Sequence, residues 1–549
     1  MIATIIVGAR EIFPDYKIPE NIESVVSTIS KETILFELAG LNYQLKPKDK
    51  VETDSSIQTQ RELFEHYCST EELLKTYLKA MDAIQKKHTG KDVFGKAIFF
   101  NRQACLYGIE LLLNSELKFN EHNRNMRDGK NWENYLLFLS LLNTAVSDVR
   151  PNKDSPDFEE LNALMLPLND ISIESDIFYE PIRGFELIKY LAQNEDIGDF
   201  VEQFFMEKYG VEYPIFFKNI VSLYLGKKNS DKRLEFTFIA EENTKILEEL
   251  SKRVSNENIF DLLSIKVGPL NKCGFKERCY YILDSMLLLE RSYTILINDL
   301  WFNGLKTKEV NGKKVPIREY KGLIGLFIEN YIDETLNYSF QKERHIKLFT
   351  FDDLKIIGKN KDEELADFYI RRDNKICIGQ LKSTTINSIQ RTSADTTELY
   401  KNNRRKFYDT HGMKQIITSI IHLDSISEVD KGYKINSRKD IFPIILVTDK
   451  IFQTPLISNQ FNDEFRMRLG EVKEQISDKY KIHHLALVHI TDLELLSNNF
   501  HDNPKLFWSI LRHYADNKRL IPPFYSSANK FLTKPPIERL MKFFSQFLE

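Results

Sequence analysis

The chain has 549 residues, of which 42% are hydrophobic and 28% are charged, and its formal net charge is -4. This composition excludes a disordered or fibrous protein, and the length favours two to four domains over a single core. The mild acidity excludes a protein that coats nucleic acid over its whole surface, so any nucleic-acid surface must be local.

Cysteine usage and the first residues indicate a cytoplasmic protein. The five cysteines are scattered, and Cys273 and Cys279 lie six residues apart, which is not a zinc spacing, so we expect reduced thiols. The first ten residues lack a basic region ahead of their short apolar run and predict a first strand, not a signal peptide. No apolar stretch reaches the roughly 18 residues needed to span a bilayer, so we expect no membrane association.

The N-terminal half predicts a small β-rich segment and then a long helical region. Over residues 1–55, β-branched and aromatic residues between Gly and Pro predict strands at 3–7, 23–29 and 33–45. Over 56–310, apolar residues recur mostly at helical spacing, with one strand expected at 234–240. We expect a linker at 148–157 and the main domain boundary in the polar segment 306–316.

After that boundary the pattern predicts the order helix, strand, strand, strand, helix, strand. These elements are expected at 319–340, 346–357 (one strand or two short ones), 365–370, 376–383, 412–423 and 441–448. A further strand is expected at 482–490, within a domain covering 315–500, and a helical extension over 501–549. The whole chain is therefore expected to be a multidomain protein of the α+β or α/β class.

Polar side chains interrupt the two strands of the expected hairpin. Asp367 lies in the first apolar run, and Gln380, Leu381 and Lys382 end the second. Because side chains alternate along a strand, Gln380 and Lys382 point to the same face and Leu381 to the other. An acid, an oxygen ligand and a lysine at one spot suit a divalent metal that activates water against a phosphodiester. The competing interpretation is a turn-capping aspartate beside an ordinary strand-end lysine.

This Asp…Gln-x-Lys pattern on a hairpin resembles the PD-(D/E)xK nuclease superfamily, in the Mrr-type variant where glutamine replaces the second acid. The resemblance covers about 319–450, extends loosely to about 500, and implies a restriction-endonuclease-like αβββαβ core. It implies Mg²⁺, with Mn²⁺ as a substitute, held by Asp367, Gln380 and the backbone carbonyl of Leu381. Lys382 would then position or deprotonate the attacking water.

Further candidates lie on the flanking helices. Family members carry a glutamate on the first helix, and Glu329 fits, with Gly322 and Gly325 expected to let that helix approach the sheet closely; Glu334 is a rival. Gln415 on the second helix is a candidate for supporting the metal ligands.

A local basic excess indicates where nucleic acid could bind. Residues 371–440 contain 14 Lys or Arg against 8 Asp or Glu, and Lys401, Arg404, Arg405 and Lys406 are the expected phosphate contacts. A solvated helix face is the alternative interpretation.

We therefore expect a Mg²⁺-dependent DNA endonuclease, with RNA not excluded as substrate, that acts in bacterial restriction or phage defence. Residues 56–310 would recognise a target or partner. Double-strand cleavage needs two sites, so we expect a homo-oligomer. The chain has no GxxxxGK[ST] motif, so a separate ATPase or sensor protein could activate it. The alternative is a non-catalytic nucleic-acid-binding or scaffold subunit that keeps the nuclease fold, which the Gln380 replacement favours.

Overall fold

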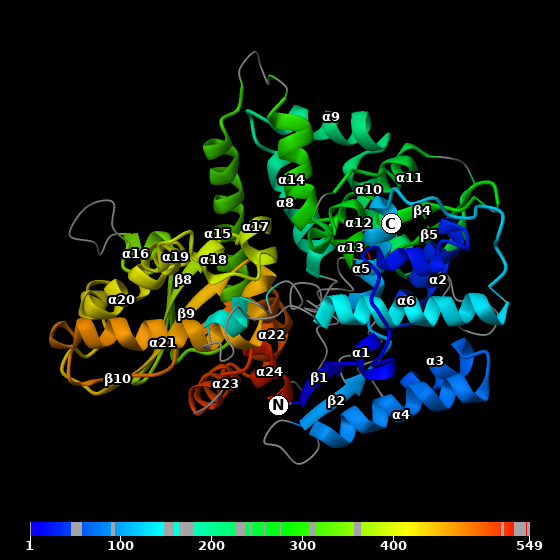
Figure 1. Cartoon of the computed structure of the whole chain (residues 1–549). Helices are drawn as coiled ribbons and strands as arrows, with labels where there is room; N and C mark the ends of the chain where they lie inside the picture. The colour runs from blue at the N-terminus through cyan, green and yellow to red at the C-terminus, as the bar shows by residue number, and fades with distance from the viewer. Residues whose placement is uncertain are drawn as a thin grey trace. The chain divides into compact units, whose positions relative to one another are not determined.

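The structure is a computed structural model, and it describes residues 2–45, 57–88, 94–126, 128–147, 159–163, 166, 179–225, 236–241, 244–256, 258–274, 276–307, 309, 314–355, 364–517, 521–531 and 545. The chain is a mixed α/β protein that divides into two compact units (Figure 1). Unit 1 comprises Met1–Arg150 and Arg183–Asn311, and unit 2 comprises Pro151–Ile182 and Gly312–Glu549. The division after Asn311 falls inside the polar segment 306–316. The expected linker at 148–157 lies outside the described residues.

Unit 1 is mostly helical, with two small sheets. Its elements are β1 (Ile2–Ile6), α1 (Ala9–Ile12), a 3-10 helix (Ile22–Val26), α2 (Lys31–Gln44), α3 (Ile57–Tyr67), α4 (Glu71–His88), β2 (Phe94–Ile98), α5 (Arg102–Asn114), α6 (Gly129–Ser147), α8 (Tyr179–Ala192, which begins in the unit 2 segment), α9 (Gly198–Tyr209), α10 (Tyr213–Leu225), β3 (Thr237–Ile239), α11 (Lys245–Leu250), a 3-10 helix (Ile259–Asp261), α12 (Leu263–Val267), β4 (Leu270–Lys272), β5 (Cys279–Ile282), α13 (Ser285–Glu290), α14 (Thr294–Leu300) and a π-helix (Trp301–Leu305).

The β-rich segment expected over 1–55 is wrong. Within its described residues β1 is the one strand, the expected strand at 23–29 is mostly a 3-10 helix, and 33–45 lies almost wholly in helix α2. Helix α2 is buried on most sides against α5 and β5, so it has the all-round apolar composition of a buried strand. Ser30 starts this helix, because its hydroxyl accepts a hydrogen bond from the Thr33 amide at 3.2 Å.

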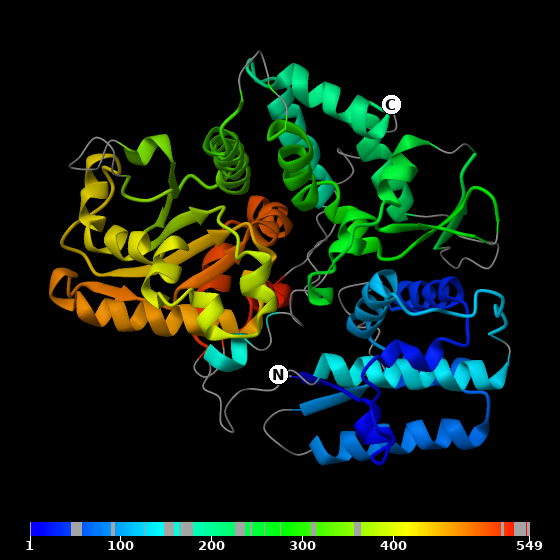
Figure 2. The same cartoon turned by 45° about the horizontal axis from the view of Figure 1, so that its top comes forward.

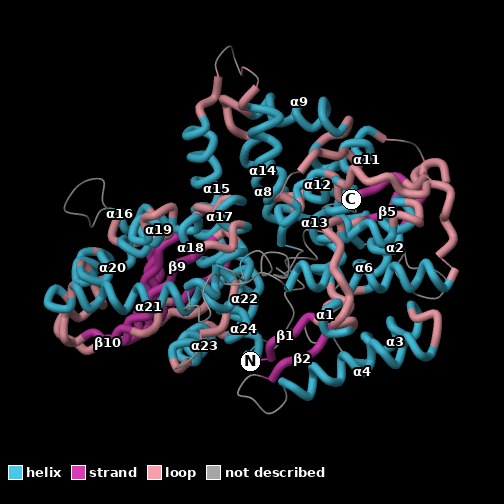
Figure 3. The backbone as a smooth tube through the Cα atoms, in the orientation of Figure 1, coloured by secondary structure: helices cyan, strands magenta, loops and turns pink. Residues whose placement is uncertain are grey.

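Two small sheets organise unit 1 (Figure 3). Strand β1 pairs in parallel with β2, a strand that the helical pattern did not predict. Buried amides join the ends of this pair to α6: Asn143 Nδ2 donates to the carbonyls of Val7 and Phe99 at 2.8 and 2.9 Å. Strands β3, β5 and β4 form an antiparallel sheet in that order, of which only β3 was expected.

Unit 2 surrounds a larger sheet. After a helical segment that includes residues 159–163 and 166, its elements are α15 (Ile317–Phe340), β6 (Ile346–Thr350), α16 (Asp352–Lys355), β7 (Phe368–Arg372), β8 (Lys375–Lys382), α17 (Ser388–Thr392), α18 (Thr396–Tyr400), α19 (Arg404–Thr410), α20 (Met413–Ile421), a 3-10 helix (Leu423–Glu428), β9 (Lys439–Val447), a 3-10 helix (Lys450–Gln453), α21 (Pro455–Glu471), a 3-10 helix (Lys473–Gln475), β10 (Tyr480–Ile482), β11 (Ala486–His489), α22 (Ile490–Asp502), α23 (Lys505–Ala515), α24 (Phe524–Ala528) and a 3-10 helix (Asn529–Phe531).

The sheet of unit 2 has the order β10-β9-β8-β7-β6, and β11 also pairs with β9. Strand β7 pairs antiparallel with both β6 and β8, whereas β9 pairs in parallel with β8, β10 and β11. The order α15, β6, β7, β8, α20, β9 is the order expected from the sequence. Helices α16, α17, α18, α19 and α21 were not expected, and α16 occupies the second half of the strand expected at 346–357. The strand expected at 482–490 is β11, which the structure separates from the end of β10. Helices α23 and α24 belong to unit 2, not to a separate extension.

Helices cover both faces of this sheet (Figure 2). On one face, Ile376 and Ile378 share an apolar core with α20, α21 and two residues from earlier in the chain, Ala163 and Leu166. On the other face, Phe442 contacts Trp508 of α23 with ring centroids 5.9 Å apart. In the part of the chain that the structure describes, no helix combines the length and the apolar character needed to cross a membrane.

Candidate active site

The hairpin of β7 and β8 fixes the register of the expected site. A two-residue turn joins the strands, with Asp373 in the left-handed region at φ 57°. Phe368 pairs with Gly379, so Asp367, one residue earlier, lies opposite Gln380 and on the same face. The Asp367 amide donates to the Gly379 carbonyl at 3.0 Å, and the Leu381 amide donates to Asp367 Oδ2 at 2.5 Å. The strand pairing therefore holds this carboxylate beside Gln380.

Lys382 lies on the same face as Gln380, against the start of α20. Gly412 precedes that helix with φ 93°, and a Cβ added there would come within 3.1 Å of Lys382 Cε. Lys382 is half-buried. A glycine at this position therefore gives the lysine stem room to pass the backbone and reach the end of β8.

Gln380 is buried, with 3% of its surface exposed, and its amide orientation is determined by α20. The Ser419 hydroxyl donates to the Gln415 carbonyl at 2.8 Å, so its oxygen is left to accept, and Gln380 Nε2 donates to it at 3.1 Å. Among the described residues, Gln380 Oε1 has no hydrogen-bond partner. The end of the amide that could bind a cation is therefore the free end.

Electrostatic interactions connect Asp367, Lys382 and Glu329. Burial raises the pKa of Asp367 to about 6, opposed by Lys382 and by the Leu381 amide. Burial lowers the pKa of Lys382, opposed by Asp367, Glu364 and Glu329. Burial raises the pKa of Glu329, and Glu364 raises it further. The structure thus brings the three charged residues expected from the sequence into one electrostatic neighbourhood.

The expected role of Gly322 and Gly325 on α15 is wrong. Among the described residues, a Cβ added at either position would meet nothing within 4 Å outside its own helix, so neither glycine lets α15 approach the sheet there. Of the two carboxylates considered on this helix, Glu329 and Glu334, it is Glu329 that interacts with Lys382. Glu329 reaches the group from a helix whose buried face packs against α22 and β6.

Sequence reasoning missed two further charged residues, Glu364 and Lys355, that interact with this group. Glu364 raises the pKa of Asp367 and of Glu329. Lys355, at the end of α16, lies 2.7 Å from an Asp352 oxygen and 3.6 Å from a Glu364 oxygen. The only signal in the sequence was an acid three residues before Asp367, outside the apolar run.

The side chains that could offer a metal ligand at this site are oxygen donors. Among the described residues, no group of three or more His, Cys, Asp or Glu side chains could hold a metal ion. The oxygen atoms that could bind a cation at this site are those of Asp367, the free Gln380 Oε1 and those of Glu329. Mg²⁺ commonly binds through one or two carboxylates and keeps several waters, so this smaller set fits it.

The four basic residues expected to contact nucleic acid differ in exposure and in their ion pairs. Lys401, Arg405 and Lys406 are exposed. Arg404 instead forms ion pairs with Glu159 and with the buried Glu464, so its charge is neutralised within the fold. Gln415 has an exposed side chain, whose amide forms no hydrogen bond with Gln380. Its backbone carbonyl accepts the hydrogen bond of the Ser419 hydroxyl, and that hydroxyl in turn orients Gln380.

All five cysteines are free. A comparison of the chain with protein-family models, with curated proteins and with solved structures found no match. The function of the site therefore rests on its own residues.

Proposed function

We propose that unit 2 is a Mg²⁺-dependent nuclease with a restriction-endonuclease-like core of the PD-(D/E)xK type. The observation that carries this proposal is the hairpin register, which sets Asp367 opposite Gln380, with Lys382 on the same face. The electrostatic interaction of Asp367 and Lys382 with Glu329 on the preceding helix supports it.

Each residue has a distinct role in this proposal. Asp367, Gln380 Oε1, Glu329 and the Leu381 carbonyl would hold the metal, which when bound neutralises charge on the phosphodiester and activates water. Lys382 would position the attacking water and donate to the phosphate oxygen where negative charge grows. Burial lowers the pKa of its ammonium, which makes proton exchange with that water easier. The product would carry a 5′-phosphate, as the resemblance implies.

The substrate we propose is DNA, with RNA as the alternative. Lys401, Arg405 and Lys406 are exposed on the segment that joins β8 to α20, and they would contact the phosphate backbone. Unit 1 would serve as the recognition or regulatory part of a bacterial restriction or phage-defence effector, by analogy alone. Two copies would act together on a duplex.

The test is cleavage of supercoiled plasmid, linear DNA and RNA with Mg²⁺, Mn²⁺ or EDTA. We expect metal-dependent cutting that Asp367→Asn reduces by about 10³-fold or more, because it removes a charge on which metal binding depends. Asp373→Asn is the matched control: it removes a carboxylate from the turn of the same hairpin, where asparagine tolerates the left-handed backbone, and should cut normally. Full activity of the Asp367 variant would refute the site.

A non-catalytic nucleic-acid-binding subunit is the second candidate. It is favoured by the amide at position 380 and by the lack, among the described residues, of a three-ligand group of His, Cys, Asp or Glu. In that case DNA binds but is not cut under any condition. A nuclease that needs a separate ATPase or sensor would cut only after that partner is added.

A further inference from the structure

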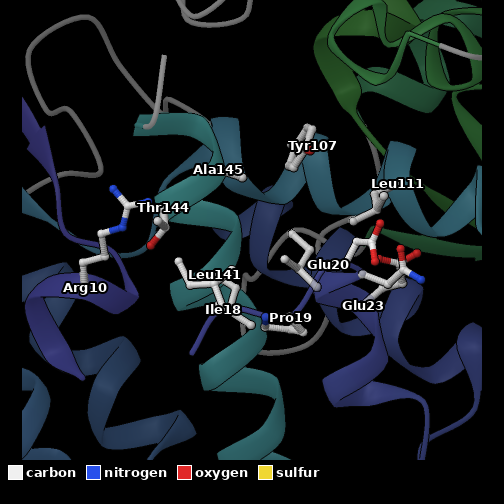
Figure 4. A pocket seen from close by; sticks show the side chains of 12 residues that line it. Arg10, Ile18, Pro19, Glu20, Glu23, Tyr107, Leu111, Leu141, Thr144 and Ala145 are labelled. Carbon is white, nitrogen blue, oxygen red and sulfur yellow. The ribbon is translucent and has the colours of Figure 1, made fainter. Parts of the chain in front are cut away.

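Unit 1 contains a pocket that the proposed function does not use. It has a volume of about 440 Å³ and lies between α1, the segment 18–23, α5 and α6 (Figure 4). This volume lies within the range of roughly 300–1,000 Å³ that is usual for small-molecule sites.

A buried carboxylate lines one side of this pocket. Glu23 exposes only 7% of its surface, and its Oε1 accepts a hydrogen bond from Ser115 Oγ at 3.1 Å. Among the described residues its Oε2 has no hydrogen-bond partner, and Oε2 is not shut off from solvent. Lys31 interacts electrostatically with Glu23, but its ammonium donates to the Ser115 carbonyl at 3.0 Å and not to Glu23. A carboxylate this buried gains from a second hydrogen-bond donor.

The rest of the lining separates charge from apolar surface. Glu20, which lies beside Glu23 in Figure 4, and Asn21 add exposed acceptors to the lining. In Figure 4, Arg10 lies at the opposite side of the view, and Leu141 and Ile18 lie between them. A cation bound at Glu23 would therefore have an apolar surface for its body.

An aromatic ring completes the lining. Tyr107 of α5 lines the pocket, and its ring stacks on Phe260 with centroids 5.3 Å apart. A ring fixed in this way can contact an apolar or cationic group at little cost in side-chain entropy.

We propose that this pocket binds a small organic ammonium ion with an apolar body, whose ammonium group donates to Glu23 Oε2. An anion would meet the carboxylates of Glu20 and Glu23 against the single arginine, Arg10. A neutral ligand of the same shape would leave the buried carboxylate without a charged partner. The pocket thus selects for a positive charge at one end and an apolar group at the other.

The test is isothermal titration of the full chain with 2-phenylethylamine, butylamine and tryptamine, beside 2-phenylethanol and 3-phenylpropanoate. We expect saturable one-to-one binding of at least one amine and none of the alcohol or the carboxylate. Glu23→Gln should weaken amine binding about tenfold or more, the loss typical of a charge-assisted hydrogen bond. Glu121→Gln, the matched control, changes the same net charge and also acts on Lys31 but does not line the pocket, so binding should persist.

A second variant covers the case in which Glu23→Gln does not fold. Ala145→Phe fills the pocket from α6 without touching the carboxylate and should abolish amine binding. Failure of all three amines to bind, or equal binding by the wild type and the Ala145 variant, would overturn the proposal. Because the readout is binding and not cleavage, the result is independent of whether unit 2 is a nuclease.

Discussion

Glu37, on α2 of unit 1, is a mostly buried carboxylate with no hydrogen bond among the described residues. Burial raises its pKa to about 7. The folded protein therefore keeps this proton at pH values where the unfolded chain has lost it. The contribution to the free energy of unfolding is largest below about pH 4.5 and falls as the pH rises through about 7.

Glu37→Gln should remove this pH dependence. At pH 8 we expect the variant to be more stable than the wild type by about 1–3 kcal/mol, and at pH 4.5 the two should be nearly equal. Urea unfolding at the two pH values measures the difference. Glu116→Gln, at an exposed position on the same unit, should have no such effect, and a wild type that is equally stable at both pH values would contradict the prediction.

Arg404 and Arg405 are neighbours in the sequence with opposite expected roles. Arg404→Ala leaves the buried Glu464 with Arg468 as its remaining ion-pair partner and should destabilise unit 2 by about 1–3 kcal/mol. Arg405 exposes 71% of its side chain, so Arg405→Ala should leave stability unchanged. If DNA binds here, the second variant lowers the salt dependence of binding by about one unit of slope. Thermal unfolding and DNA titrations at several salt concentrations check both, and the reverse pattern would contradict this assignment.

At the scale of elements, the start of α20 determines where Lys382 lies. Gly412→Ala would place a methyl group 3.1 Å from Lys382 Cε in a backbone at φ 93°. We expect the free energy of unfolding to fall by about 1–2 kcal/mol. We also expect the cleavage rate to fall by more than this loss of folded protein explains, because Lys382 must move.

Gly322→Ala is the matched control on α15. In the described part of the chain, nothing outside α15 itself lies within 4 Å of the added methyl group, so the helix should gain about 0.5–1 kcal/mol and cleavage should be unchanged. Chemical unfolding and cleavage assays on both variants separate the two cases. If the Gly322 variant is less stable than the wild type, the result would support the close approach of helix and sheet that the sequence suggested.

At the scale of the whole molecule, unit 2 depends on a segment that precedes most of its own residues in the chain. Leu166 is fully buried in the core shared with α20 and α21, and Asn162 Nδ2 donates to Gln460 Oε1 at 2.7 Å. The chain therefore crosses between the units twice before residue 312. A fragment that begins at residue 312 lacks part of the core of unit 2.

Leu166→Ala should destabilise unit 2 by about 2–5 kcal/mol, the cost typical of a buried leucine. The fluorescence of Trp508 measures the unfolding of unit 2 when Trp132 and Trp301 of unit 1 are replaced by phenylalanine. Leu161→Ala, at a side chain with 38% exposure in the same segment, should change the unfolding midpoint little. Equal effects of the two variants would show that the segment does not pack as the structure has it.

Local patterns predicted the elements that depend on near neighbours. The hairpin of β7 and β8 follows from two apolar runs and a polar turn. The alternation of side chains placed Gln380 and Lys382 on one face, and the tight turn between the strands placed Asp367 beside them. Glu364 could not be placed in this way, because it lies outside both runs. The strand predicted in place of helix α2 was wrong because a buried helix and a buried strand have the same apolar composition.

The sequence by itself determined the alternation along the strands of the hairpin, the succession of α15, β6, β7, β8, α20 and β9 apart from the shorter helices between them, and the residue types of the candidate site. Only the tertiary structure decided that Arg404 is neutralised by Glu159, 245 residues away, and that Ser419 orients Gln380. It also decided that Ala163 and Leu166 join the core of unit 2 and that Glu23 faces a pocket. The reason is physical: periodicity is set by bonds between near neighbours, whereas burial and pairing depend on contacts between distant segments, which exist only in the folded chain.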